Sequence, residues 1–70
     1  ERKQRGVIKS LLASGLSERE AQICNMILQG HTAKSIGNAL GLSESTITTY
    51  KNRAFKKLQI NRKSELVRFV

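Results

Sequence analysis

The chain contains no proline, no tryptophan and no aspartate, and it has one cysteine and one histidine among its 70 residues. A single cysteine excludes an intramolecular disulfide, and we expect Cys24, which lies among apolar neighbours, to be a small core residue. With one His, one Cys and no Asp, neither a metal cluster nor a catalytic triad can be assembled from these residues. We therefore expect neither an enzyme nor a metal or other cofactor.

Long apolar runs are also missing from the sequence. No stretch of about eighteen apolar residues exists, so we expect no transmembrane helix, and the short apolar runs near the start do not form a signal peptide. A length of 70 residues suits one small domain with a small core. We expect a cytoplasmic protein, and because the chain opens on the polar run ERKQR rather than on Met, we expect it to be part of a longer protein.

Acidic residues are few and unevenly placed. Thirteen Lys and Arg residues face five acidic residues, which gives a formal net charge of +8. The segment from Lys51 to Lys63 holds six cations and no acid. A one-sided positive field of this kind favours a polyanionic partner, either nucleic acid or an anionic membrane surface, although a basic surface that only keeps the protein soluble is the simpler interpretation.

Capping residues and glycines divide the chain into short helices. Ser17 with Glu20 three residues later forms a capping box, and Gly30 is placed to end the helix that follows. Thr32 is the expected N-cap of a short helix that ends at Gly41, and Ser43 the cap of a longer helix over residues 44–58. A short helix before Gly15 is expected to place Val7, Ile8, Leu11 and Leu12 on one apolar stripe. With a last helical segment after Asn61, these elements make an all-α fold: a four-helix bundle containing a helix-turn-helix, with a short extra N-terminal helix or linker.

The helix over residues 44–58 has two different faces at about 100° per residue. One face is apolar and is expected to be buried. The opposite face carries hydroxyls first, an amide next and cations last, namely Ser45, Thr48, Thr49, Asn52, Arg53 and Lys56. Thr can hydrogen-bond to bases or contact the thymine methyl, Asn can pair with adenine, and Lys and Arg meet phosphates. Since Ser and Thr lower helix propensity, their presence here favours DNA reading over a simply solvated face.

The sequence resembles the LuxR-type helix-turn-helix domain of bacterial transcription regulators. LSEREAQICNMILQG is similar to that family's opening, TAKSIGNALGLSESTITTY to its central motif, and KKLQINRKSELV to its close. The resemblance begins at Leu16, so residues 16–70 are expected to form the DNA-binding domain and residues 1–15 a linker or N-terminal helix that follows a missing sensing domain. Glu20 matches the glutamate of the opening motif, which in this family helps to hold the scaffold against Arg or Lys of the helix over 44–58.

The resemblance also implies roles for individual residues. Double-stranded DNA is the expected partner, the nucleoid the expected place, and RNA polymerase a candidate further partner. The expected base-reading residues are Thr48, Thr49 and Asn52. The expected phosphate-binding residues are Thr32, Lys34, Ser45, Lys51, Arg53 and Lys56. The family binds DNA as a dimer through its last helix, and the apolar end formed by Val67, Phe69 and Val70 suits that role, unless it packs on the first helix instead.

Several positions depart from the family pattern, and two other functions stay open. Many members carry Glu where this chain has Ser35, which implies weaker capping of the short helix, and Gly where it has Gln59, which bears on the bend before the last segment. Many members also carry Lys or Arg at the base-reading positions of Thr48 and Asn52. A cationic helix that binds anionic lipid is a rival function, but the chain has no Trp and its apolar residues are needed for a core. The other rival is a module that binds an acidic protein through the same basic face.

Overall fold

The computed structural model describes the backbone of residues 2–69 and the side chains of residues 6–68. It contains four α-helices and a 3₁₀ helix: α1 (Arg2–Ala13), α2 (Glu18–Leu28), α3 (Ala33–Leu40), α4 (Glu44–Leu58) and η1 (Lys63–Phe69). No strand occurs between residues 2 and 69, which confirms the all-α prediction. The first helix is longer than expected, because the Lys, Gln and Arg residues before Gly6 are good helix formers that extend it. None of the helices described is long and apolar enough to cross a membrane.

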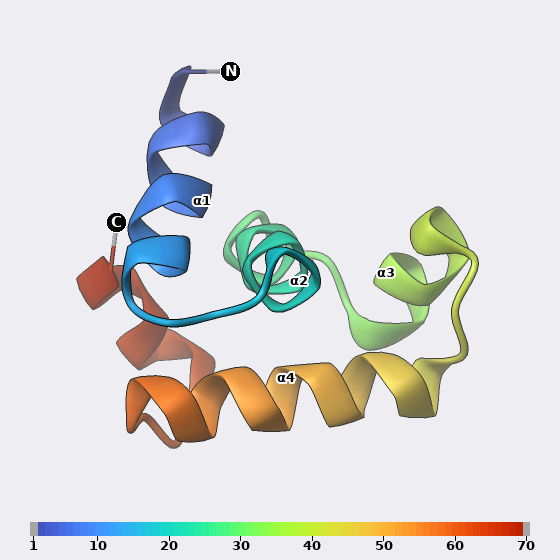
Figure 1. The fold of residues 1–70 in the computed structure, drawn as a ribbon. Helices are drawn as coiled ribbons and strands as arrows, with labels where there is room; N and C mark the ends of the chain where they lie inside the picture. The colour runs from blue at the N-terminus through green and yellow to red at the C-terminus, as the bar shows by residue number, and fades with distance from the viewer. Residues whose placement is uncertain (1, 70) are drawn as a thin grey trace.

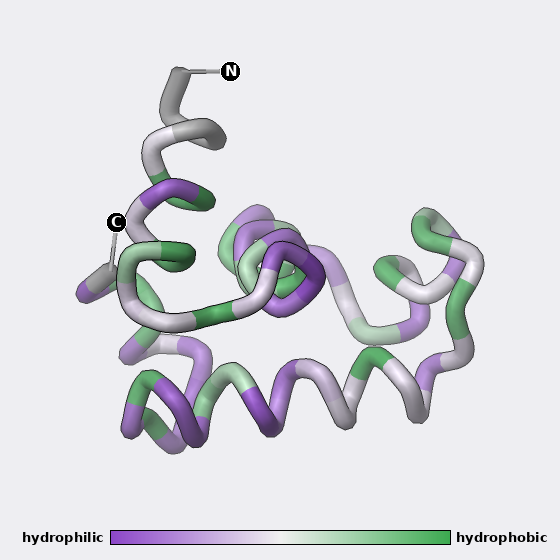
Figure 2. Tube along the Cα trace, viewed as in Figure 1, coloured by the Kyte–Doolittle hydropathy of each residue, from purple (hydrophilic) through white to green (hydrophobic). Residues whose placement is uncertain are grey.

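The helices pack around α2, which Figure 1 shows end-on at the centre of the molecule. α4 runs beneath both α2 and α3, and η1 returns to contact α1 and α2. Along α4, hydrophilic and hydrophobic residues alternate at helical spacing, as the colours of Figure 2 show. Each of the five elements contributes a fully buried apolar side chain to one core: Leu11, Ile23, Ile36, Ile47 and Leu66. Burying each such side chain stabilises the fold by roughly 1.5–3 kcal/mol, so all five elements contribute to the stability of one core.

Three hydroxyl side chains start the helices, as the sequence predicts. Ser17, Thr32 and Ser43 are the N-caps of α2, α3 and α4, and each side-chain oxygen accepts a hydrogen bond from the backbone N–H three residues later. The capping box at Ser17 is complete. These local hydrogen bonds fix where α3 and α4 begin, and therefore which of their residues reach the surface.

The turn between α3 and α4 requires two glycines for different reasons. Gly41 ends α3 in the left-handed conformation, with φ of 71°. Gly37 lies against the backbone of the turn, where an added Cβ would come within 2.6 Å of the Leu42 carbonyl oxygen. The close neighbours of Gly37 are therefore the turn itself and, at 3.6 Å from the added Cβ, the Glu44 backbone nitrogen at the start of α4. The Leu42 N–H also donates to the Gly37 carbonyl at 2.9 Å.

Two further expectations need correction or completion. The predicted apolar stripe of the first helix includes Leu12, but this side chain is 39 % exposed, whereas Leu11 beside it is fully buried. Gln59 ends α4 in the left-handed conformation with φ of 59°, the geometry that glycine adopts most easily. The bend is therefore made without glycine, at a conformational cost of about 1–2 kcal/mol.

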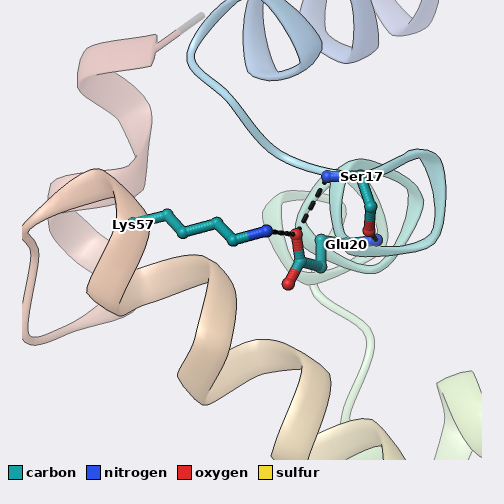
Figure 3. A network of polar contacts seen from close by, with 3 residues as sticks. All are labelled: Ser17, Glu20 and Lys57. Atoms are coloured by element: carbon teal, nitrogen blue, oxygen red, sulfur yellow. Dashed lines mark hydrogen bonds and ion pairs between the residues drawn. The ribbon is translucent and has the colours of Figure 1, made fainter.

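A buried carboxylate joins α2 to α4. Glu20 is 3 % exposed, and its Oε1 accepts hydrogen bonds from the Ser17 backbone N–H at 2.9 Å and from Lys57 Nζ at 2.7 Å. Figure 3 shows Lys57 reaching from α4 to Glu20 on α2, with Ser17 beside it. Burial alone raises the pKa of Glu20, but the hydrogen bonds from Lys57 and Ser17 outweigh it, so the pKa lies below its usual value. Glu20 is thus an ionised scaffold residue, in agreement with the role that the family resemblance implies.

Replacing Gly37 by alanine should lower the free energy of unfolding by about 1–3 kcal/mol, because the added methyl group meets fixed backbone. Gly6→Ala is the matched control, since Gly6 is also helical and an added Cβ meets nothing within 4 Å. The control should be neutral or more stable by up to ~1 kcal/mol. Urea unfolding followed by circular dichroism measures both, and equal stability of the two variants would contradict the tight turn.

Acid should destabilise the protein through Glu20. A carboxyl whose pKa is lower in the folded state contributes stability that is complete above its unfolded pKa, about 4.3, and is lost as pH falls through the folded value. Glu20→Gln should therefore be less stable than the wild type by about 1–3 kcal/mol at pH 7, and the gap should narrow toward pH 3. Urea titrations at both pH values test this, with exposed Glu18→Gln as the control. A gap that does not change with pH would show that the ionised pair is not stabilising.

Candidate nucleic-acid interface

The polar face of α4 points to solvent along its whole length. Ile47, Ala54 and Leu58 lie in the core. The six residues predicted to form the opposite face are all exposed: Ser45, Thr48, Thr49, Asn52, Arg53 and Lys56. An α-helix presented in this way on a small domain has the width and the polar groups that the major groove of DNA accepts. The predicted base-reading residues therefore share one accessible surface.

The two threonines of this face are oriented by their own helix. Thr48 Oγ1 donates to the Glu44 carbonyl at 3.1 Å, and Thr49 Oγ1 donates to the Ser45 carbonyl at 3.0 Å. Because each hydroxyl proton is already used, each side chain offers a methyl group and an oxygen that can accept a hydrogen bond. These groups complement the thymine methyl and the amino donors of adenine and cytosine.

The start of α3 lies beside the middle of α4, so its residues join the same region. Thr32 is exposed, and its side-chain oxygen accepts from the Ser35 N–H at 3.1 Å, while Lys34 is exposed in the first turn. His31 is exposed in the turn before α3, and its Nδ1 lies 3.2 Å from Ser35 Oγ. The first turn of a helix leaves backbone N–H groups free for an anion.

The cations at the end of α4 do not all have the same freedom. Lys57 is held by Glu20, and Lys51 is half-buried with its Nζ 5.9 Å from the centre of the Phe55 ring. Arg53 and Lys56 are exposed. Because Lys57 is paired with Glu20, it belongs to the scaffold, whereas Arg53 and Lys56 are available to a partner. The helix dipole also favours cations near this C-terminus.

A cleft of about 320 Å³ brings together three segments that are far apart in the sequence. Apart from Ile27 of α2, its lining comes from the turn before α3 and the start of α3, the middle of α4, and the loop before η1 with the start of η1. The lining residues are Ile27, His31, Thr32, Ala33, Lys51, Asn52, Phe55, Asn61, Arg62 and Lys63. Sequence reasoning did not assign a role to Arg62 or Lys63. The run of cations without acids that ends at Lys63 was the signal, but only the fold shows that these two side chains share a cleft with Asn52.

The predicted dimerisation residues are only partly within the described structure. Val67 is 57 % exposed, whereas its neighbour Leu66 is fully buried between η1 and the other helices. Val70 and the side chain of Phe69 lie outside the described residues. Leu12 and Val67 are thus large apolar side chains that this part of the fold leaves in water.

Comparison with known proteins identifies relatives over most of the chain. It is 49% identical over 51 residues to the response regulator GacA of Pseudomonas aeruginosa, covering 73% of this chain and 24% of that protein. The virulence factors putative positive transcription regulator BvgA of Bordetella pertussis is 38% identical over 58 residues, or 83% and 28% of the two chains. The response regulator UvrY of Escherichia coli is 43% identical over 53 residues, or 76% and 24%.

The chain therefore spans about a quarter of the length of these relatives. No solved structure gave a significant match. The family model described as bacterial regulatory proteins, luxR family, matches residues 14–70, which include α2, α3, α4 and η1. The chain belongs to the LuxR family of bacterial regulatory proteins.

Proposed function

We propose that this chain binds double-stranded DNA sequence-specifically and regulates bacterial transcription, with α4 as its recognition helix in the major groove. The observation that carries the proposal is the exposed face of α4, on which oriented hydroxyls and an amide are followed by free cations. None of these six side chains contributes to the core, so the composition of this face is free to suit a partner. The family to which the chain belongs supports the same function.

In this proposal α4 divides its contacts between bases and backbone. Asn52 pairs with a base edge, adenine being the best match for its amide, while Thr48 and Thr49 place a methyl and an acceptor against neighbouring base pairs. Arg53 and Lys56 meet phosphates and fix the depth and register of the helix without reading sequence. α3 crosses the DNA backbone, and Thr32 and Lys34 at its start contact phosphates there. Ser45 and Lys51 of α4 contact further phosphates.

The domain acts as the output part of a longer regulator. Two of the relatives are named response regulators, and each is about four times as long as the segment that this chain matches. We propose that residues 1–15 are the linker to a preceding sensing domain and that residues 16–70 form the DNA-binding domain. The protein would then act on the nucleoid in the cytoplasm, with RNA polymerase as a further partner.

Asn52→Ala and Lys56→Ala separate base reading from phosphate binding. With a duplex selected from a random pool, Asn52→Ala should relax the preference at one base pair by roughly 1–3 kcal/mol, because it loses a base contact. Lys56→Ala should weaken all duplexes alike and lower the salt slope by about one. Fluorescence anisotropy over a salt series measures both, with exposed Gln22→Ala and Lys9→Ala on other helices as controls.

The outcome of this experiment also separates the rival functions. If no DNA motif is selected, and anionic vesicles or an acidic protein bind more tightly than duplex DNA, the proposed function fails. If a motif is selected but Asn52→Ala leaves the preference at every position unchanged, DNA binding stands and the assignment of α4 as the reading element is wrong.

We further propose that two copies bind DNA together through η1, because Val67 is exposed in water beside the buried Leu66. The selected site should then contain two half-sites about one helical turn apart. Val67→Glu should remove cooperative binding to the double site and leave binding to a single half-site unchanged. Gel-shift titrations of both duplexes measure this, and cooperativity that survives the substitution would contradict pairing through η1.

A further inference from the structure

The cleft between α3, α4 and η1 has a basic lining. Of its cations, the DNA contacts proposed above include Lys51 but not Arg62 or Lys63. Lys51, Arg62 and Lys63 contribute the formal charges of the lining, and no acidic side chain takes part in it. The polar groups of Thr32, Asn52 and other neighbours complete its walls. Such a lining complements an anion, since bringing three cations together is unfavourable unless a negative charge lies between them.

The cations of the cleft are held by the fold in two ways. Lys51 is half-buried and lies over the Phe55 ring, which limits the positions that its ammonium group can take. Arg62 and Lys63 follow Asn61 in the loop between α4 and η1. This loop is fixed by Glu65, whose Oε2 accepts from the backbone N–H groups of Asn61 at 2.7 Å and Arg62 at 3.2 Å.

The nearest acid is therefore turned to the loop backbone rather than to the cleft. The hydrogen bond from Asn61, together with that from Arg62 and the nearby charge of Arg68, keeps the pKa of Glu65 below its usual value. Glu65 Oε1 also lies 3.9 Å from the guanidinium of Arg68. Glu65 thus orders the loop through its backbone and pairs with Arg68, and the charge of Arg62 also contributes to its lowered pKa.

We propose that this cleft seats one backbone phosphate of the bound duplex, held by Lys51, Arg62 and Lys63. The inference rests on the proposed DNA binding and extends it. Asn52, the residue proposed to read a base, lines the same cleft, so the strand that crosses the end of the reading face passes its mouth. An arginine guanidinium can bind a phosphate through two parallel hydrogen bonds, and the N-terminus of α3 beside Thr32 adds favourable backbone dipoles.

The seat makes the loop before η1 part of the DNA-binding surface. Arg62 and Lys63 would hold this phosphate from outside the recognition helix, while Lys51 would hold it from α4 itself. A phosphate fixed there limits how far α4 can rotate about its own axis in the major groove. It therefore determines which base edge the Asn52 amide contacts. Phosphate contacts act in this way on register while carrying no sequence information themselves.

The test combines Arg62→Ala and Lys63→Ala with charge-neutral phosphates. Each variant is titrated with the selected duplex over a salt series, with Lys9→Ala on α1 as the control of equal charge change. Each cleft variant should lower the salt slope by about one and weaken binding five- to tenfold at about 0.1 M salt. A set of duplexes with single methylphosphonate substitutions then locates the phosphate, whose neutralisation should weaken the wild type but have little further effect on Arg62→Ala.

The outcomes separate this inference from the proposed function. If the wild type selects a motif and Asn52→Ala relaxes it, but Arg62→Ala and Lys63→Ala bind as Lys9→Ala does, the seat is wrong and DNA binding stands. If both cleft variants weaken binding while every methylphosphonate acts equally on variant and wild type, the cations act only through a diffuse field and the seat is again wrong. If the wild type binds no duplex, the proposed function itself has failed.

Discussion

The carboxylate of Glu20 is buried and is tolerated in the core only because it is paired. One partner, the Ser17 N–H, is close in the sequence, and the other, Lys57, lies on α4. The Ser17 N–H fixes the start of α2, and Lys57 fixes the last turn of α4 against it. Desolvating a charge costs several kcal/mol unless hydrogen bonds compensate it. The same pair therefore links α2 to the last turn of α4, whose opposite side carries the exposed face.

That exposed face is built at some expense in helix stability. Thr48 and Thr49 have lower helix propensity than Ala or Lys, and they use their hydroxyl protons on their own backbone. The Ser43 cap and the packing of Ile47 and its buried neighbours hold α4 helical in spite of this. α4 thus depends on tertiary contacts for its shape, which leaves its solvent side free to carry groups suited to a partner rather than to the helix.

The sequence predicted the features that depend on local chemistry. Caps and glycines act within one turn, so the bounds of α3 and α4, including the end of α3 at Gly41, followed from the pattern. The neighbour of Gly37 and the cleft beside Arg62 did not, because both arise from residues that meet only after folding. Gln59 shows the reverse case, in which the fold imposes a left-handed conformation where the residue type gives no signal for it.

The central claim is that the exposed side of α4 and the adjoining cleft form the DNA-binding surface. Titrating the isotope-labelled chain with its selected duplex, and following every backbone amide by NMR, tests this most directly. The account predicts that the largest shifts fall on residues of the α4 face, on the start of α3 and on the loop before η1, with α1 little affected. Shifts centred on α1 and η1, or spread evenly over the basic surface, would contradict it.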